Sequence, residues 1–130
     1  MSQTSLVACV DDDASVCEAI VGFLEALGFA VMAFPSAEDL LQFDRLGQVS
    51  CVITDVKLGG MSGLQLQDRL AASGHRTPTI VVTALSDERV RAQALSAGAV
   101  CFLSKPVSKE DLLAGIRSAL RGQAAAGTRP

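Results

Sequence analysis

The most chemically suggestive stretch of the chain is a run of three adjacent carboxylates, Asp11, Asp12 and Asp13, directly after the apolar residues 6–10. Two carboxylates about 5 Å apart repel each other by roughly 3 kcal/mol at an effective dielectric constant of 20. Helix N-capping would explain one of these acids, and either Asp12 or Asp13 is placed for it. The remaining negative charge requires a different explanation, and a bound cation would provide one.

Other polar side chains end later apolar runs. Asp55 closes "CVITD", Thr83 closes "IVVT", and Lys105 lies in "FLSKP". If these runs are parallel neighbouring strands, their carboxyl ends meet at one edge of a sheet, which is where such sheets bind ligands. The sequence therefore predicts that three carboxylates (Asp11, Asp12 and Asp55) converge with one hydroxyl and one ammonium group.

The composition of this patch predicts its chemistry. Lys105 offsets only one of the three negative charges, so a divalent cation would complete the neutralisation. The ligands are all oxygens, which favours Mg²⁺ or Mn²⁺ over Zn²⁺. Mg²⁺ held this way recruits phosphate oxygens, and an adjacent carboxylate such as Asp55 can attack phosphorus to form an aspartyl phosphate. Thr83 and Lys105 could then bind phosphoryl oxygens.

A regular alternation of elements would position these residues. Apolar runs suited to strands occupy residues 6–10, 29–34, 51–54, 79–83 and 99–103, and several lack polar alternation, as strands covered on both faces do. Helical three- and four-residue steps separate them, most clearly in Val16, Ala19, Ile20, Phe23, Leu24 and Leu27, and less regularly in Leu64, Leu66 and Leu70. Five strands alternating with five helices predict an α/β fold with a parallel sheet and right-handed crossovers.

The expected helix boundaries carry suitable residues. Serines stand at the N-cap positions Ser36, Ser86 and Ser108, and acids that resemble half of a capping box follow two of them at Asp39 and Asp111. Glycines suited to the left-handed C′ position follow the helical segments at Gly28, Gly47, Gly74, Gly98 and Gly122. After Leu120 the periodicity stops, so residues 1–121 are expected to form one domain and residues 122–130 a flexible tail or the start of a linker.

Composition narrows the function classes. The chain has 130 residues, 49% of them hydrophobic, which suffices for one domain with its own core. The net charge is −3 without a Lys/Arg run, so we expect no direct nucleic-acid binding by this segment and no membrane association. The cysteines have no metal-ligand spacing and are expected to be reduced core thiols of a cytoplasmic protein: Cys9, Cys17, Cys51 and Cys101.

Four segments together carry a family resemblance. "VDDD", "VITDVKLGGMSG", "IVVTAL" and "FLSKP", in this order, resemble the receiver domain of bacterial two-component response regulators, over residues 5–121. "SAEDLL" and "AGAVCFLSKP" are similar to the receivers joined to helix-turn-helix transcriptional outputs. The resemblance implies a flavodoxin-like (βα)5 fold, with strand order 2-1-3-4-5 and helices on both faces of the sheet.

The resemblance also implies roles for individual residues. Asp55 would be the phosphoacceptor, taking its phosphoryl group from the phosphohistidine of a histidine kinase. Mg²⁺ would be bound by Asp11, Asp12, Asp55 and the backbone carbonyl of Lys57. Lys105 would bind the phosphoryl group, next to a cis peptide bond at Lys105–Pro106.

Further residues would transmit the signal. Thr83 and Phe102 would be the switch pair, both turned inward in the state that the phosphoryl group favours. Lys57 and Leu85 occupy positions that tune dephosphorylation in the family. The fourth helix, the fifth strand and the last helix would form the signalling surface, where a phosphorylation-dependent homodimer or a partner contact could form. The chain would thus be a signalling module and not an enzyme, controlling a transcriptional output outside this segment.

Two other functions are compatible with parts of the sequence. A phosphohydrolase of the haloacid-dehalogenase type would use Asp11 as nucleophile, because Asp11-x-Asp13 resembles the opening motif of that class. The chain is short for such an enzyme and has no acidic pair after the fourth strand and no cap insertion. A flavodoxin-like cofactor binder is disfavoured because the turn after the first strand is acidic, whereas a phosphate cradle needs Gly, Ser or Thr and free N–H groups.

Overall fold

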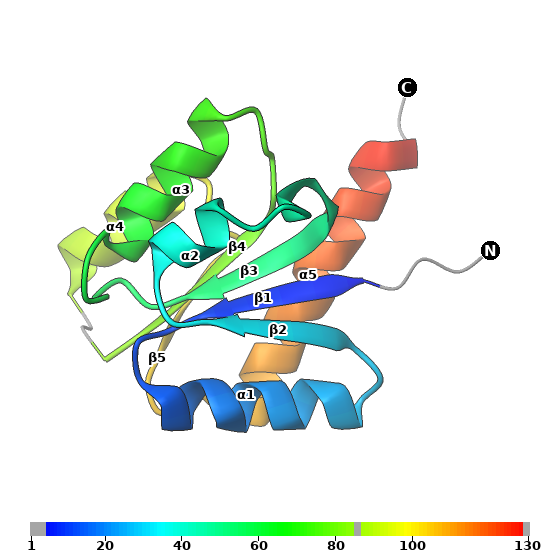
Figure 1. Cartoon of the computed structure of the whole chain (residues 1–130), viewed down its shortest axis with the longest axis horizontal. Coiled ribbons are helices and arrows are strands. Elements are labelled where there is room, and N and C mark those ends of the chain that lie inside the picture. Colours follow the sequence, from blue (N-terminus) through cyan, green and yellow to red (C-terminus); the bar gives the residue numbers. More distant parts are fainter. Residues whose placement is uncertain (1–4, 85–86, 129–130) are drawn as a thin grey trace.

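The computed structural model describes the backbone of residues 5–84 and 87–128, and the side chains of residues 5–84 and 87–121. A parallel sheet in the order β2-β1-β3-β4-β5 forms its centre (Figure 1). Its strands are β1 (Leu6–Val10), β2 (Ala30–Phe34), β3 (Val49–Thr54), β4 (Thr79–Thr83) and β5 (Cys101–Ser104). The predicted fold class and strand order are confirmed.

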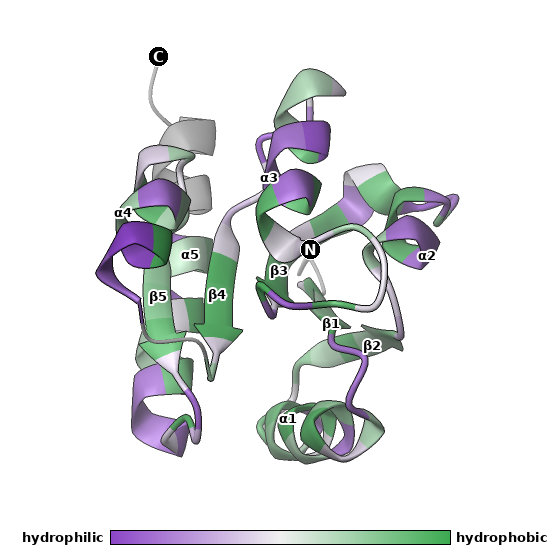
Figure 2. Ribbon diagram, turned by 90° about the vertical axis from the view of Figure 1, so that its left-hand side faces the viewer, coloured by the Kyte–Doolittle hydropathy of each residue, from purple (hydrophilic) through white to green (hydrophobic). Residues whose placement is uncertain are grey.

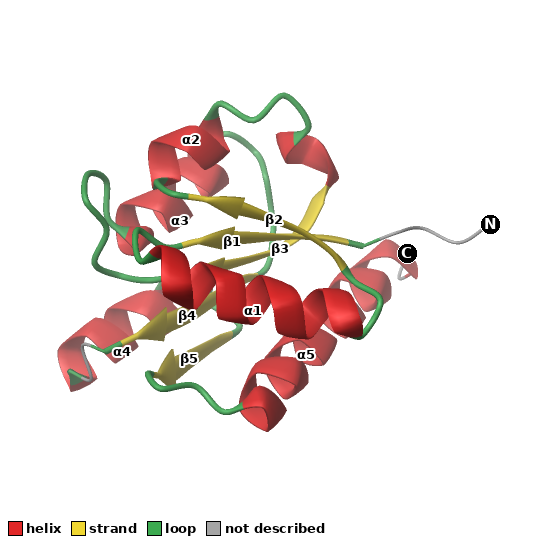
Figure 3. Cartoon of the chain, turned by 60° about the horizontal axis from the view of Figure 1, so that its bottom comes forward, coloured by secondary structure: helices red, strands yellow, loops and turns green. Residues whose placement is uncertain are grey.

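Helices cover both faces of the sheet. They are α1 (Ala14–Ala26), α2 (Ala37–Leu41), α3 (Gly63–Ala72), α4 (Glu88–Ser96) and α5 (Lys109–Thr128), with a short 3₁₀ turn η1 (Leu46–Gln48) before β3. Helices α1 and α5 lie on one face, and α2, α3 and α4 on the other (Figure 3). None of the helices in the described ranges is long and apolar enough to span a bilayer.

Strand β1 shows why the apolar runs lack polar alternation. Val7 and Cys9 pack toward α1 and α5, while Ala8 and Val10 pack toward α2 and α3. All four residues are almost completely buried, so both sides of the strand require apolar residues. The hydropathy colouring shows largely apolar strands between helices that contain both polar and apolar residues (Figure 2).

Side-chain caps start the helices close to the predicted positions. Asp13 caps α1, accepting hydrogen bonds from the Ser15 and Val16 N–H groups. Ser36 caps α2, and the Ser108 hydroxyl accepts from the Asp111 N–H at the start of α5. The cap of α4 is Asp87, whose carboxylate accepts from the Arg89 N–H at 2.8 Å, so the expectation of Ser86 at this position was wrong. Ser86 itself and Leu85 lie outside the described residues.

Three of the five glycines end helices as predicted. Gly28, Gly74 and Gly98 have φ values of +97°, +84° and +103°, in the left-handed region that glycine adopts at low cost. In each case the following residue donates back into the last helical turn, as Ala99 N–H does to Ala94 O at 3.0 Å. These are Schellman motifs.

The remaining boundaries differ from the predictions. Phe29 and Ala99 close the Schellman motifs after α1 and α4, so β2 starts at residue 30 and β5 at residue 101. β3 begins two residues earlier than expected, at residue 49. Gly47 lies inside η1, and α5 continues through Gly122 to Thr128. The segment after Leu120 is rich in alanine, which favours helix continuation more than its lack of periodicity suggested. That residues 122–130 serve as a tail or linker stays a prediction.

Candidate functional site

The backbone brings the predicted site residues to one edge of the sheet. Asp11 follows β1, Asp55 follows β3, Thr83 ends β4 and Lys105 follows β5. Backbone hydrogen bonds fix these ends: the Asp55 N–H donates to Val10 O at 3.3 Å, and the Lys105 N–H donates to Thr83 O at 2.9 Å. Register between parallel strands therefore determines where the side chains meet.

Lys105 bridges two buried carboxylates. Its Nζ lies 2.9 Å from Asp11 Oδ2 and 2.7 Å from Asp55 Oδ2. The side chains of Asp11 and Asp55 are only 5% and 9% exposed, and that of Lys105 is 19% exposed. Groups separated by 94 and 50 residues in the chain thus form one charge cluster. The predicted meeting of residues 11 and 55 at the sheet edge is confirmed.

Backbone N–H groups orient the second oxygen of each acid. Asp11 Oδ1 accepts from the Asp13 N–H at 2.9 Å, and Asp55 Oδ1 accepts from the Lys57 N–H at 3.1 Å. Each carboxylate is therefore held between a backbone donor and the shared ammonium group. This arrangement fixes the orientation of both carboxylates.

The charge states follow from these contacts. Burial lowers the pKa of Lys105, but hydrogen bonds and attraction from Asp55 and Asp11 raise it by more. The pKa of Lys105 therefore lies above the ordinary 10.5. The ammonium is therefore charged at neutral pH. For Asp13, hydrogen bonds from the Ser15 hydroxyl and from the Val16 and Ser15 N–H groups lower the pKa, which suits a helix cap.

An open cleft of about 440 Å³ lies over the charge cluster. It is lined by Asp11, Asp12, Asp13, Asp55, Lys57, Leu58, Thr83, Ala84 and Lys105. These include every residue predicted to bind metal or phosphoryl oxygens. Phe102 does not line the cleft; it is half-buried against the cluster of Val81 and Ala94 near α4.

The three acids predicted to converge all line this cleft, but they are not grouped around one point. No three Asp, Glu, His or Cys side chains within the described ranges are grouped closely enough to hold a metal ion. Asp11 and Asp55 share Lys105, whereas Asp12 is exposed on the cleft wall. The donor set still fits Mg²⁺, which usually takes one or two carboxylates and completes its shell with water and phosphate oxygens. The residues thus fit a largely hydrated magnesium ion and not a protein cage.

A close contact beneath Asp55 was missed by the sequence reasoning. Gly63, the first residue of α3, donates its N–H to Val56 O at 2.9 Å. A Cβ at this position would collide with the backbone carbonyl oxygen of Asp55 and lie 3.2 Å from Thr54 Oγ1. Only glycine lets α3 approach the end of β3 this closely.

The start of α3 is further fixed by a reciprocal capping box. Ser62 Oγ accepts from the Gln65 N–H at 3.1 Å, and Gln65 Oε1 accepts from the Ser62 N–H at 2.9 Å. Across the loop, Glu38 of α2 accepts from the Met61 N–H at 3.0 Å. The Ser-x-x-Gln spacing is a recognisable capping signal and could have been found in the sequence; the Glu38 contact carries no local signal.

Comparison with known proteins gives consistent matches. Residues 7–117 match the response regulator receiver domain family. The transcriptional regulatory protein TdiR of Thauera aromatica is 40% identical over 116 residues, covering 89% of this chain and 51% of that protein. The response regulator protein TmoT of Ectopseudomonas mendocina is 39% identical over 121 residues, covering 92% of this chain and 54% of TmoT.

Solved structures agree with the sequence matches. The response regulator StyR superposes with a TM-score of 0.88 at 35% identity, covering 95% of this chain and 63% of that chain. The chain spans about half the length of the curated relatives named above.

Proposed function

The chain belongs to the response regulator receiver domain family, and we propose that Asp55 is its phosphoacceptor, taking a phosphoryl group from the phosphohistidine of a cognate histidine kinase. The observation that carries this proposal is the position of Asp55. Its carboxylate is bound to Lys105 and to the Lys57 N–H, in the wall of an open acidic cleft. The haloacid-dehalogenase alternative with Asp11 as nucleophile is not supported, because the chain matches receivers over most of its length.

Lys105 would serve Asp55 both before and after transfer. The ammonium offsets the negative charge that would otherwise repel an incoming anionic phosphoryl group. After transfer it can pair with a phosphoryl oxygen as a charge-assisted donor. The Lys57 N–H holds the other carboxylate oxygen, so Asp55 enters the reaction already oriented.

Magnesium would be held by Asp11, Asp12, Asp55 and the backbone carbonyl of Lys57. A bound Mg²⁺ supplies positive charge to the phosphoryl oxygens during transfer. Asp12 is the exposed member of this set, lines the cleft and would bind the ion directly. Asp11 is already engaged by Lys105 and the Asp13 N–H, which suits a ligand acting through water.

Phosphorylation would act as a population shift. Thr83 is buried at the cleft end of β4, where its hydroxyl could approach a phosphoryl oxygen on Asp55. Phe102 lies on the neighbouring strand β5, paired with Val81. An inward shift of both side chains would alter the surface formed by α4, β5 and α5.

The output and the partners extend beyond this chain. The curated relatives are about twice as long and are named a transcriptional regulatory protein and a response regulator protein. We infer a transcriptional output outside this segment, a cytoplasmic location and no chemistry beyond the receiver's own phosphorylation and dephosphorylation.

Phosphorylated protein should also dimerise through α4, β5 and α5. Light scattering would then show a doubled mass, and a phosphorylated sample that stays monomeric at high concentration would contradict this.

Acetyl phosphate with Mg²⁺ tests the phosphoacceptor directly. Intact-mass measurement should show the parent protein gaining one phosphoryl group and Asp55→Asn gaining none. Asp68→Asn, an exposed acid of α3, is the matched control and should be phosphorylated like the parent protein. An adduct that persists in Asp55→Asn would overturn the assignment.

A further inference from the structure

Two cysteines outside the phosphorylation chemistry lie in contact in the core. Cys9 of β1 and Cys17 of α1 have their Sγ atoms 3.7 Å apart, which is close to van der Waals contact for two sulfurs. Both are free thiols, with exposed fractions of 1% and 6%. Burial alone would favour treating them as packing residues, but two sulfurs in contact can also react with each other.

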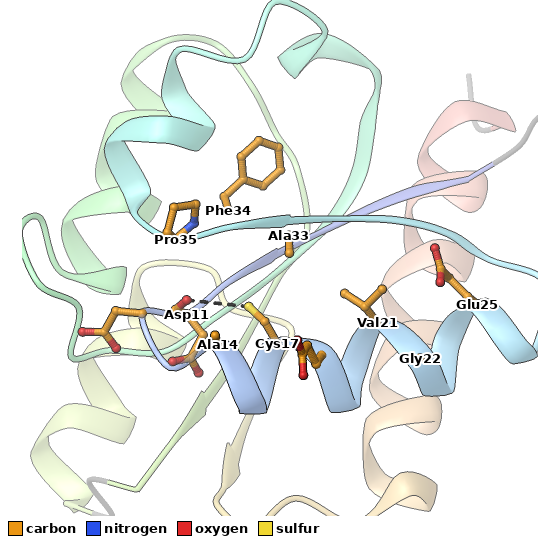
Figure 4. Close-up of a pocket in the computed structure, with 11 residues that line it drawn as sticks. Asp11, Ala14, Cys17, Val21, Gly22, Glu25, Ala33, Phe34 and Pro35 are labelled. Carbon is orange, nitrogen blue, oxygen red and sulfur yellow. Dashed lines mark hydrogen bonds between the residues drawn. The ribbon is translucent and has the colours of Figure 1, made fainter.

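Cys17 is the more accessible of the two cysteines. Cys17 lines a cleft of about 430 Å³ between α1 and β2, and Cys9 is not part of its wall (Figure 4). A small reagent entering the cleft would therefore meet Cys17 first. Cys9 lies behind it, placed to react second.

The lining of this cleft selects the kind of reagent. Its charged side chains are all acidic: Asp11, Asp12, Glu18 and Glu25. The rest of the wall is largely apolar, with Val21 and Phe34 among its residues. Such a site repels anionic oxidants, including disulfides of acidic peptides, and admits small neutral hydroperoxides.

Cys17 is also coupled to the phosphorylation site. Its Sγ lies 3.6 Å from the backbone oxygen of Asp11, within reach of a weak S–H hydrogen bond (Figure 4). The carboxylate of Asp11 is one of the two bound by Lys105. The acidic loop of residues 11–13 lies between Cys9 and Cys17 in the sequence.

We propose that Cys9 and Cys17 form a peroxide-sensitive dithiol whose disulfide restrains the acidic loop and slows phosphorylation of Asp55. The Cys17 sulfur attacks the hydroperoxide, the O–O bond breaks, and water or an alcohol leaves as a sulfenic acid forms. The Cys9 sulfur then displaces the hydroxyl group as a second water, which carries away the remaining thiol proton. Two electrons pass from the sulfurs to the peroxide.

Closing the S–S bond has a defined structural consequence. The sulfurs must approach from 3.7 Å to about 2.05 Å, which draws α1 toward β1. The Cys17 S–H group is lost, and with it the contact to the Asp11 carbonyl. Both changes act on the loop that carries the acidic residues of the site. In reducing compartments, disulfides of this kind are usually transient and redox-sensing.

Mass spectrometry tests the dithiol independently of phosphorylation. Treatment of the reduced protein with hydrogen peroxide should remove the mass of two hydrogen atoms, and dithiothreitol should restore it. Peptide mapping without reduction should find Cys9 joined to Cys17. Methionine oxidation adds mass and cannot imitate this loss.

Alanine variants separate the two pairs of cysteines. The Cys51→Ala/Cys101→Ala protein should still lose two hydrogens, whereas Cys9→Ala and Cys17→Ala should not. The pair of Cys9 and Cys17 is distinguished by the 3.7 Å contact between its sulfurs. A loss that persists without Cys9 or Cys17, a disulfide-linked dimer as the main product, or no loss in the parent protein would overturn the proposal.

The effect on phosphorylation rests on the proposed function and forms the second arm. The oxidised Cys51→Ala/Cys101→Ala protein should accept a phosphoryl group from acetyl phosphate about tenfold more slowly than its reduced form, because a misplacement of about 1 Å can slow a reaction by up to about 100-fold. Equal rates with the disulfide fully formed would overturn the coupling. If the reduced protein takes up no phosphoryl group, the proposed function fails, and the mass measurement still decides the dithiol.

Discussion

Among single residues, Lys105 has the strongest electrostatic role in the site. One ammonium group neutralises two carboxylates that are almost fully buried. Removing one partner of such a group costs more than the pair contributes, because the remaining charges stay desolvated without compensation. Here two acids would be left facing each other.

We therefore predict that Lys105→Met lowers the free energy of unfolding by about 2–4 kcal/mol in metal-free buffer at neutral pH. Urea denaturation followed by circular dichroism measures the change. Lys57→Met is the matched control, because Lys57 is an exposed lysine on the same cleft, and it should change the free energy by less than about 0.5 kcal/mol. Equal stability of both variants would show that the acids are not effectively desolvated.

The difference in stability between the parent protein and Lys105→Met should also depend on pH. The pKa of Lys105 is raised in the folded protein, so its stabilising contribution is fully present below the unfolded value of 10.5 and is lost as pH rises through the folded pKa. The stability difference between the parent protein and Lys105→Met should be constant from neutral pH to about 10 and then narrow. A difference that widens at alkaline pH would contradict the assignment.

At the scale of elements, the junction between β3 and α3 holds the phosphoacceptor in place. The helix starts directly against the backbone of Asp55, and this contact depends on Gly63. The capping box of Ser62 and Gln65 fixes the first turn of α3. The position of Asp55 is therefore set by the element that follows it as well as by the strand that precedes it.

Two glycine substitutions test this junction. Gly63→Ala should destabilise the protein by about 1–3 kcal/mol, as overpacking does, and should slow acetyl phosphate labelling of Asp55. Gly22→Ala is the control: a Cβ there meets nothing within 4 Å, so alanine should stabilise α1 by about 0.5–1 kcal/mol. Thermal melts and intact-mass time courses give both readouts. If Gly63→Ala is destabilised but labelled at the normal rate, the junction between β3 and α3 does not control the reactivity of Asp55.

The elements also show what local sequence could predict. The ends of β1, β3, β4 and β5 were recognisable because an apolar run stops at a polar residue, and parallel register then places those residues together. The glycines after α1, α3 and α4 were recognisable because the Schellman motif favours that residue. These features depend on a few neighbouring residues only.

The features that were not predicted depend mostly on contacts between distant parts of the chain. The convergence of Lys105 with the acids was predicted, but not that it would bridge Asp11 and Asp55 and leave Asp12 exposed, because that depends on side-chain packing across several strands. The approach of Gly63 to Asp55 is likewise a tertiary contact. Gly47 and Gly122 were misjudged because a glycine alone does not distinguish a helix end from a turn or a continuing helix.

For the whole molecule, ligand binding at the cleft should stabilise the native state. An ion that binds the folded chain and not the unfolded chain adds RT ln(1 + [L]/Kd) to the free energy of unfolding. The proposed magnesium ligands come from the ends of β1 and β3, and strand β1 contributes to the cores on both faces of the sheet. Binding at this edge therefore resists the cooperative unfolding of both layers.

Mg²⁺ at about ten times its dissociation constant should add about 1.4 kcal/mol to stability, and raise the melting temperature by about 3–6 °C. Asp12→Ala should remove most of this rise, whereas Asp44→Ala, another exposed acid, should retain it. Scanning calorimetry with and without Mg²⁺ measures both. If Mg²⁺ does not change the melting temperature of the parent protein, the proposed metal site is wrong.

Strand β5 lies at an edge of the sheet, and within the described residues β4 is its one neighbouring strand. The residue that follows it, Lys105, reaches past β4 to acids attached to β3 and β1. Ion pairs thus link the edge strand of the sheet to its central strands. A group that competes with Lys105 for these two carboxylates would therefore weaken the attachment of the β5 edge to the centre of the sheet.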